Sequence, residues 1–157
     1  MRRRGGDGAG AVGVAAVDLR GDRLVVYASS QTKDGFWITN GTFELLDHDA
    51  GDEELGAAVL RVLATSRSGV RTPNLRRAPS PFTPVLDALG LGSWNAYARG
   101  VRHVHVERTG STVQVSPSRN GGAKEGFVGA AEPAAVVTDP TAEALGAAVR
   151  AVLLRST

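Results

Sequence analysis

The sequence contains no cysteine and few aromatic residues. None of its 157 residues is cysteine, and only 5% are phenylalanine, tryptophan or tyrosine. Without cysteine the chain has no disulfide, no thiol chemistry and none of the tightest protein ligands for zinc. Because aromatic side chains are scarce, we expect a core of valine, leucine and alanine. The absence of cysteine agrees with a cytoplasmic protein.

Long apolar runs are also missing. None approaches the roughly 20 residues that span a bilayer, so we expect no contact with membranes. The basic start, M-R-R-R-G-G-D-G-A-G, precedes an apolar stretch that is too short for a secretory signal. We interpret residues 1–10 as a flexible basic tail. Residues 11–157 are enough for a single domain with a real core.

The charge is small in total but unevenly distributed. The formal net charge of +2 owes three positive charges to Arg2, Arg3 and Arg4, so the overall basicity is weak evidence for nucleic-acid binding. Five arginines and no acid lie between Arg61 and Arg77. Five acids gather in a short stretch that we call the acidic corner: Asp47, Asp49, Asp52, Glu53 and Glu54. The sequence therefore predicts a dipolar molecule.

The chain repeats itself. Glu53 to Ser66 matches Glu143 to Ser156 at nine of fourteen positions without a gap. The segments upstream also match, so that Lys33-Asp34-Gly35-Phe36 corresponds to Lys124-Glu125-Gly126-Phe127. We predict two similar halves, about 14–67 and 101–156, with an insertion at 68–100. Overlaid, the halves should place Gly35 on Gly126 and Leu55 on Leu145.

Each half has the pattern of a strand hairpin, a further strand and a helix. Val104 and Val106 alternate with polar residues, and Val113 and Val115 return after Thr109-Gly110. Amphipathic patterns predict helices at roughly 52–66 and 141–155. The fold class is α+β, a single domain with an antiparallel-rich sheet of about six to eight strands and these helices packed on one face. A glycine at the same point of each helix suggests close helix-to-sheet contact.

The insertion at 68–100 has no counterpart in the repeat. Its prolines prevent a long helix at the start. P-V-L-D-A-L-G-L-G then predicts a short helix that ends at Gly90 or Gly92. Ser93 is placed to cap a second helix that carries Trp94 and Tyr97.

Two glycine-rich stretches resemble phosphate sites. Pro117 to Phe127 has paired glycines with an arginine and a lysine, but it has a shorter relative in the first half and lacks the phosphate-loop spacing. We interpret it as a structural turn. Gly8 to Gly13 spells G-x-G-x-x-G, yet a charged tail precedes it and a strand pattern follows, so we reject a dinucleotide site.

Candidate sites for metal and nucleic acid rest on few residues. His103, His105 and Glu107 share one strand face, which suits a metal, but no third histidine is near and the first half lacks them. The arginines from Arg61 to Arg77 could contact phosphates, although no aromatic residues are interleaved to stack bases. We favour an ordinary strand face and a solvated loop, with no metal and no cofactor.

With these segments in view, the sequence resembles the immunity proteins of bacterial contact-dependent growth inhibition systems (the CdiI family). The resemblance rests on G-F-W-I and D-E-E-L-G-A-A-V-L-R-V-L-A-T-S-R (35–67), S-W-N-A-Y-A-R-G (93–100), P-S-R-N-G-G-A-K-E-G-F and E-A-L-G-A-A-V-R. The last helix of the family often ends in cysteine, where this chain has Ser156. The resemblance implies a cytoplasmic, non-catalytic protein that binds the toxic C-terminal domain of an exoprotein.

The resulting hypothesis is an immunity protein, not an enzyme, whose partner is a toxin domain, often a nuclease in such systems. Because nucleases present basic surfaces, we assign toxin binding to the acidic corner, with helix capping as the competing interpretation. The alternatives are a nucleic-acid-binding module that uses Arg61–Arg77 and a metal-dependent enzyme that uses His103 and His105. The oligomeric state and the identity of the toxin stay open.

Overall fold

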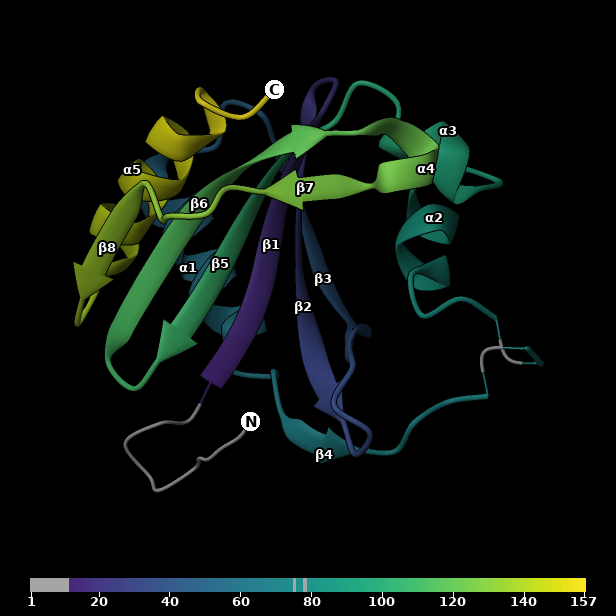
Figure 1. Ribbon diagram of the computed structural model, residues 1–157. Helices are drawn as coiled ribbons and strands as arrows, with labels where there is room; N and C mark the ends of the chain where they lie inside the picture. The colour runs from purple at the N-terminus through teal and green to yellow at the C-terminus, as the bar shows by residue number, and fades with distance from the viewer. Residues whose placement is uncertain (1–11, 75, 78) are drawn as a thin grey trace.

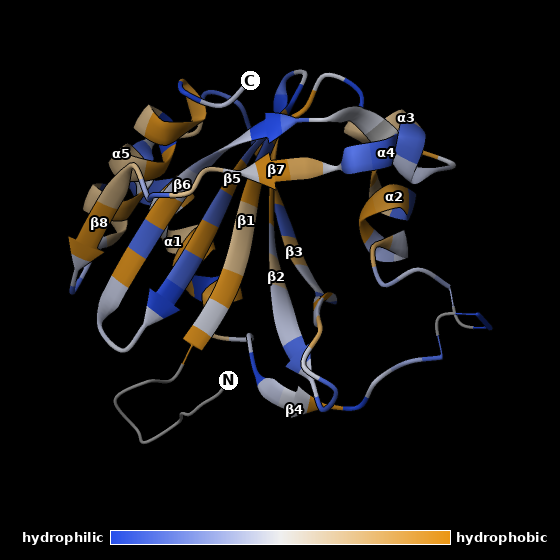
Figure 2. Ribbon diagram, viewed as in Figure 1, coloured by the Kyte–Doolittle hydropathy of each residue, from blue (hydrophilic) through white to orange (hydrophobic). Residues whose placement is uncertain are grey.

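Two β-hairpins form the centre of the molecule. In the computed structural model, which describes residues 12–74, 76, 77 and 79–157, β1 (Val12–Arg20) and β2 (Arg23–Thr32) form the first hairpin. β5 (Arg102–Thr109) and β6 (Thr112–Asn120) form the second (Figure 1). Each turn places a glycine at positive φ, 59° at Gly21 and 60° at Gly110, as two-residue hairpin turns require. The alternation of apolar and polar residues along β5 and β6 is visible in Figure 2.

The two hairpins join through their first strands. β1 pairs antiparallel with β5, and the strand order is β3-β2-β1-β5-β6-β7, with β3 (Trp37–Asp47) and β7 (Phe127–Gly129) outside. β8 (Ala135–Thr138) also pairs with β6, and the short β4 (Ser68–Val70) joins β2 in parallel. The predicted antiparallel-rich α+β fold of six to eight strands is confirmed, with eight strands in the described part of the chain.

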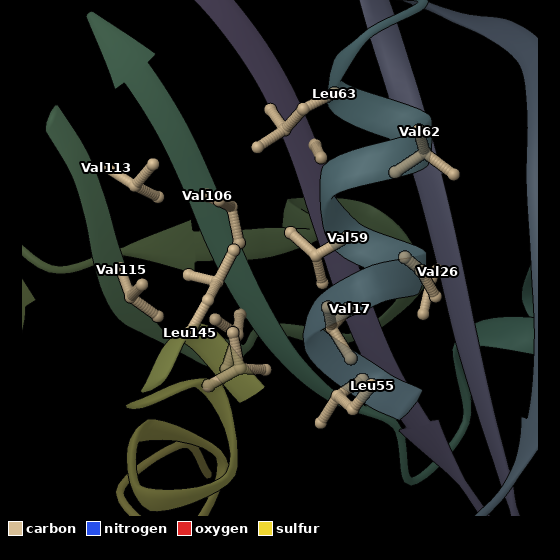
Figure 3. Packing of buried hydrophobic residues seen from close by; sticks show 14 of the residues in the cluster. Val17, Val26, Leu55, Val59, Val62, Leu63, Val106, Val113, Val115 and Leu145 are labelled. Atoms are coloured by element: carbon tan, nitrogen blue, oxygen red, sulfur yellow. The ribbon is translucent and has the colours of Figure 1, made fainter. Parts of the chain in front are cut away.

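The two predicted amphipathic helices cover one face of the sheet. α1 (Asp52–Leu63) and α5 (Ala142–Leu153) bury their apolar sides against the strands (Figure 3). This cluster consists of valine, leucine and alanine, as predicted, and Leu55 and Leu145 are both fully buried in it. The prediction that these helices pack on one face is confirmed.

The glycine within each of these helices has a different role from the predicted one. A Cβ atom on Gly56 would overlap the carbonyl oxygen of Ala142, and one on Gly146 would overlap the carbonyl oxygen of Asp52. Each glycine therefore allows the backbone of the other helix to come into close contact. The two glycines occupy equivalent positions in the repeat. The expectation of close helix-to-sheet contact is wrong, because the close contact is between α1 and α5.

The chain that follows each of these helices returns to the sheet in the same way. Ser66 Oγ accepts a hydrogen bond from Val14 N–H (3.0 Å) and donates one to the carbonyl of Ser29 (2.5 Å). Ser156 Oγ accepts from Ser118 N–H (3.2 Å) and donates to the carbonyl of His103 (2.9 Å). Each serine thus bridges two strands of its own hairpin.

The next residue of each half adds a matching backbone bond. Gln31 N–H donates to the carbonyl of Arg67 (2.7 Å), and Asn120 N–H donates to that of Thr157 (2.8 Å). Gly35 and Gly126 both have positive φ, at 94° and 70°. The duplication with halves about 14–67 and 101–156 stays a prediction, and these matched contacts support it.

The insertion at 68–100, which we call the central segment, covers the opposite face of the sheet with two short helices. α2 (Thr83–Leu89) ends at Gly90, and α3 (Trp94–Ala98) begins after Ser93, whose hydroxyl accepts a hydrogen bond from Ala96 N–H, as predicted. In Figure 1 both helices lie on the side away from α1 and α5. Six of the chain's eight aromatic residues gather beneath them: Tyr27, Phe43, Phe82, Trp94, Tyr97 and Phe127. The expected core of valine, leucine and alanine is therefore correct for one face only.

The glycine-rich loop of the second half is a structural turn. It contains the short α4 (Gly122–Glu125). Gly121 N–H donates to the carbonyl of Gly126, Gly126 N–H to that of Gly122, and Gly122 N–H to Asn120 Oδ1. These backbone donors are used within the loop, in agreement with our interpretation. The predicted tail at 1–10 and most of the G-x-G-x-x-G stretch lie outside the described residues, and Gly13 lies in β1.

Replacing Gly56 or Gly146 with alanine should destabilise the fold. The added methyl group meets backbone of the facing helix, which cannot move aside as a flexible side chain would. Overpacking of this kind costs typically about 1–3 kcal/mol and outweighs the gain of about 1 kcal/mol in helix propensity. The net effect is the difference of the two, and we expect urea unfolding to show a loss of up to about 2 kcal/mol for each variant. Gly92→Ala is the control, because Gly92 is exposed, has no positive φ, and a Cβ there meets open space; equal stability of all three variants would contradict the close crossing.

Candidate functional site

The acidic corner lies where β3 ends and α1 begins. Asp47 ends β3, and Asp49, Glu53 and Glu54 are exposed in the turn and the first helical turn. Gly51, not an acid, is the N-cap residue, and no side chain caps this helix. Glu53 and Glu54 suit the positive end of the helix dipole, whereas Asp47 and Asp49 precede the helix, which does not need them.

An arginine from the other half holds this corner in place. The guanidinium of Arg150 donates to Asp52 Oδ1 (3.1 Å), to the carbonyl of His48 (3.1 Å) and to the carbonyl of Ala50. His48 N–H in turn donates to the carbonyl of Asp22 (2.9 Å). Asp52 is therefore engaged in an ion pair within the molecule. Within the part of the chain that the structure describes, the other four acids of the corner form no ion pair.

A groove opens beside the other end of β3. It has a volume of about 600 Å³ and lies between the sheet and the central segment; its lining includes Ile38, Asn40, Val70, Arg71, Pro81 and Asp87. The walls are mostly apolar because prolines of the central segment form one side. This groove was not predicted, since the sequence did not indicate where the insertion at 68–100 folds back.

The arginines from Arg61 to Arg77 differ in whether their side chains are paired with a carboxylate. Arg61 forms two hydrogen bonds to Glu44 (2.7 and 2.8 Å), which lower the pKa of that carboxyl. Arg67 and Arg71 are exposed on either side of β4, and Arg71 lines the groove. One cation of the proposed nucleic-acid stretch is therefore already paired with a carboxylate.

His103 and His105 lie on the same strand face but have separate partners. His103 Nδ1 lies 2.5 Å from Asp18 Oδ1, and His105 Nε2 lies 3.5 Å from Glu107 Oε1. His105 lowers the pKa of Glu107, chiefly by hydrogen bonding. Among the described residues, no three histidine or carboxylate side chains converge on one point. His103 has a structural partner instead.

That partner is the centre of a buried polar cluster that the sequence analysis missed. Asp18 is completely buried in β1. Its Oδ2 accepts from the hydroxyls of Tyr27 (3.0 Å) and Tyr97 (2.5 Å), and its Oδ1 contacts His103. Because a carboxylate can only accept, Nδ1 of His103 carries the hydrogen of this contact. We call these four residues the Asp18 cluster.

The Asp18 cluster connects the central segment to the sheet. Tyr97 comes from α3, while the other three members lie on β1, β2 and β5. Arg20 adds a bond from Nε to the carbonyl of Tyr97 (3.2 Å). His103 also stacks on Phe127, with ring centroids 4.2 Å apart. No signal in the sequence marked the cluster, because Asp18 alternates with the apolar Val17 and Leu19 and so has the pattern of a residue on the outer face of the strand.

Removing the carboxylate should release the central segment. Asp18→Ala leaves two buried hydroxyls and an imidazole without their acceptor, and each buried donor left without a partner costs about 1–3 kcal/mol. We expect faster hydrogen exchange in α2 and α3 than in α1 and α5. His105→Ala is the control, because the side chains of His105 and Glu107 are 41% and 42% exposed, and such a solvent-accessible pair is worth at most about 1 kcal/mol. Equal effects of both changes would contradict a special role for Asp18.

The same cluster predicts how the protein responds to alkali. Burial, with the nearby Asp18 carboxylate, raises the pKa of Tyr27 and that of Tyr97. These are the only tyrosines in the chain. A pKa that folding raises gives a stability that is complete below the unfolded value of about 10 and declines as the pH rises beyond it. We expect tyrosinate absorbance at 295 nm to rise only together with unfolding, whereas the urea-denatured chain titrates near pH 10. Ionisation of either tyrosine near pH 10 with intact circular dichroism would contradict this.

None of the helices in the described part of the chain is long and apolar enough to cross a lipid bilayer.

The fold has relatives among solved structures. A protein of unknown function from Neisseria meningitidis, NMB0488, superposes with a TM-score of 0.76 at 20% identity, covering 93% of this chain and 96% of that chain. A CdiA-CT/CdiI toxin and immunity complex from Yersinia pseudotuberculosis contains a chain with a TM-score of 0.72 at 18% identity, covering 93% and 98%. No protein with a curated function matches the sequence. At these identities the likeness shows the fold.

The sequence itself shows the family. The CdiI family of CDI immunity proteins matches residues 14–156, which is nearly the whole described chain. The resemblance found in the sequence motifs is confirmed by this match. The protein therefore belongs to the CdiI family, the immunity proteins of contact-dependent growth inhibition.

Proposed function

We propose that this protein neutralises the toxic C-terminal domain of its cognate growth-inhibition exoprotein by binding it without catalysis, and that this domain is a nuclease. Family membership supports the immunity role, and the relative from Yersinia is described as part of a toxin and immunity complex. The protein would act in the cytoplasm, where a delivered nuclease meets nucleic acid.

The acidic corner is the observation that carries the nuclease part of the proposal. Asp47 and Asp49 are exposed and lie on a turn that Arg150 and backbone hydrogen bonds hold in one conformation. A fixed turn loses little conformational entropy on binding. Its carboxylates complement the basic surface with which a nuclease holds its substrate.

The second half of the molecule argues against a purely structural role for these acids. The equivalent helix, α5, begins with Thr141 as a capping residue and has only Glu143 in its first turn. It forms the same packing and the same close crossing as α1 without an acidic corner. The first half therefore carries more negative charge than its fold requires.

The nucleic-acid-binding alternative is less well supported. Arg61 is paired with Glu44, so the stretch from Arg61 to Arg77 presents fewer free cations than its sequence suggests. The metal-enzyme alternative loses His103 in the same way, because Asp18 holds its Nδ1.

Replacing Asp47 and Asp49 with asparagine should weaken toxin binding. A carboxylate that becomes buried against a basic partner contributes about 2–5 kcal/mol, which is roughly 30-fold or more in affinity. The loss should lie partly in the association rate and should shrink at high salt. Both side chains are exposed, so the melting temperature should not change. The measurement is calorimetric titration with the cognate toxin domain, together with protection of toxin-exposed cells.

Glu132→Gln is the matched control, because Glu132 is exposed in the loop between β7 and β8. Unchanged affinity and protection for the Asp47 and Asp49 variant would remove the acidic corner from the interface. The binding surface would then be sought on the groove beside Val70 and Arg71, within the segment from Arg67 to Arg77.

A further inference from the structure

The two aromatic residues outside the core are consecutive in the sequence, and both are exposed. Six of the eight aromatic residues pack between the sheet and the central segment. The remaining two are Phe36 and Trp37, at the connection between β2 and β3, and they are 64% and 37% exposed. In a chain with so few aromatic residues, a neighbouring exposed pair is a surface that needs a partner.

The equivalent phenylalanine of the other half is used differently. Phe127 follows the corresponding K-E-G sequence, but it stacks on His103 and contacts Trp94 edge-on at 5.6 Å. The turn before Phe36 folds with the same glycine at positive φ, yet its phenylalanine has no such role in the core. The fold therefore explains Phe127 and leaves Phe36 unexplained.

The turn that carries this pair is held firmly. Thr32 N–H donates to the carbonyl of Phe36 (2.7 Å), and Phe36 N–H donates to Thr32 Oγ1 (3.0 Å). Lys33 N–H donates to the carbonyl of Val70 (2.9 Å), which fastens the turn to β4. An exposed aromatic side chain on a fixed backbone loses little entropy on binding, and such residues dominate the energy of protein interfaces.

Three cations and one acid, Asp34, lie on or beside the turn that carries the pair, and Asp34 accepts a hydrogen bond from the Thr72 hydroxyl (2.7 Å). Lys33 belongs to the turn itself, Arg67 is bonded through its carbonyl to Gln31 opposite Trp37, and Arg71 follows the β4 residue that binds Lys33. All three cations are exposed. The apolar groove begins beside them, since Ile38 and Arg71 are part of its lining. Aromatic residues and arginines are the types most enriched in protein interfaces.

We propose that Phe36 and Trp37 anchor the toxin domain by entering an apolar pocket on it that is bordered by carboxylates. This inference rests on the proposed function and names a second contact for the same partner. It is distinct from the acidic corner, because the two ends of β3, Trp37 and Asp47, pair with Gln31 and Arg23 of β2, which lie eight residues or about 26 Å apart. At such a separation the energies of the two contacts should add.

The test uses the full chain and the cognate toxin domain, with wild type titrated first. If the wild type does not bind, the proposed function itself is wrong. If it binds, Phe36→Ala and Trp37→Ala should each weaken binding by about 30-fold, the usual threshold of a dominant interface residue. Their melting temperatures should stay close to that of the wild type. Val128→Ala is the matched control, because Val128 is the counterpart of Trp37 and is 36% exposed; it should bind normally.

Three outcomes would overturn the proposal. The first is wild-type affinity in both aromatic variants, and the second is an equal loss in Val128→Ala. The third is a different occupant of the surface. Self-association of the wild type that Trp37→Ala abolishes would identify a second copy of the chain. Salt-sensitive binding of a single-stranded oligonucleotide that Trp37→Ala abolishes would identify nucleic acid, since aromatic and cationic side chains also bind bases and phosphates.

Discussion

A single buried carboxylate determines how the central segment fits onto the sheet. Asp18 lies in the central pair of strands with no exposure to solvent, and a charge in that position is tolerated only when its oxygens are bonded. Its three partners come from a neighbouring strand on each side and from the helix above. The carboxylate of Asp18 obtains its full set of hydrogen bonds only when α3 lies over the sheet and brings Tyr97 to it. With α3 in place, the central segment folds back past β3 and forms one wall of the groove.

The opposite face obeys a different constraint, the contact of two helices through glycine. The crossing of α1 and α5 at Gly56 and Gly146 is reciprocal, and Ser66 and Ser156 return each chain end to its own hairpin. The structural demands on the two halves are therefore closely matched. Where the halves differ, the fold does not account for the difference. The acidic corner and the exposed Phe36 both belong to the first half, and both lie at the ends of β3.

The sequence predicted the elements more completely than their partners. Period-two alternation, amphipathic helices and caps such as Ser93 and Gly90 are local signals, and the structure has each of them in place. The role of Gly56 could not be inferred, because a glycine permits close approach without indicating what approaches. Asp18 has the pattern of an outward-facing polar residue between Val17 and Leu19, and its partners are up to 85 residues away. The acidic corner was visible in the sequence. The hydrogen bonds that Arg150 donates to it join the two halves and depend on the tertiary fold.

The proposed function is inhibition by binding alone, and the buried side chains of Asp18, Tyr27 and Tyr97 are hydrogen-bonded to one another within the fold. The most direct measurement is the residual activity of a fixed amount of cognate toxin domain as this protein is added, at concentrations far above the dissociation constant. Inhibition by binding predicts a linear fall that ends at one equivalent, with full toxin activity recovered after the complex is dissociated and separated. Inactivation of many toxin molecules by each immunity protein, or a toxin that stays fully active when saturated, would contradict it.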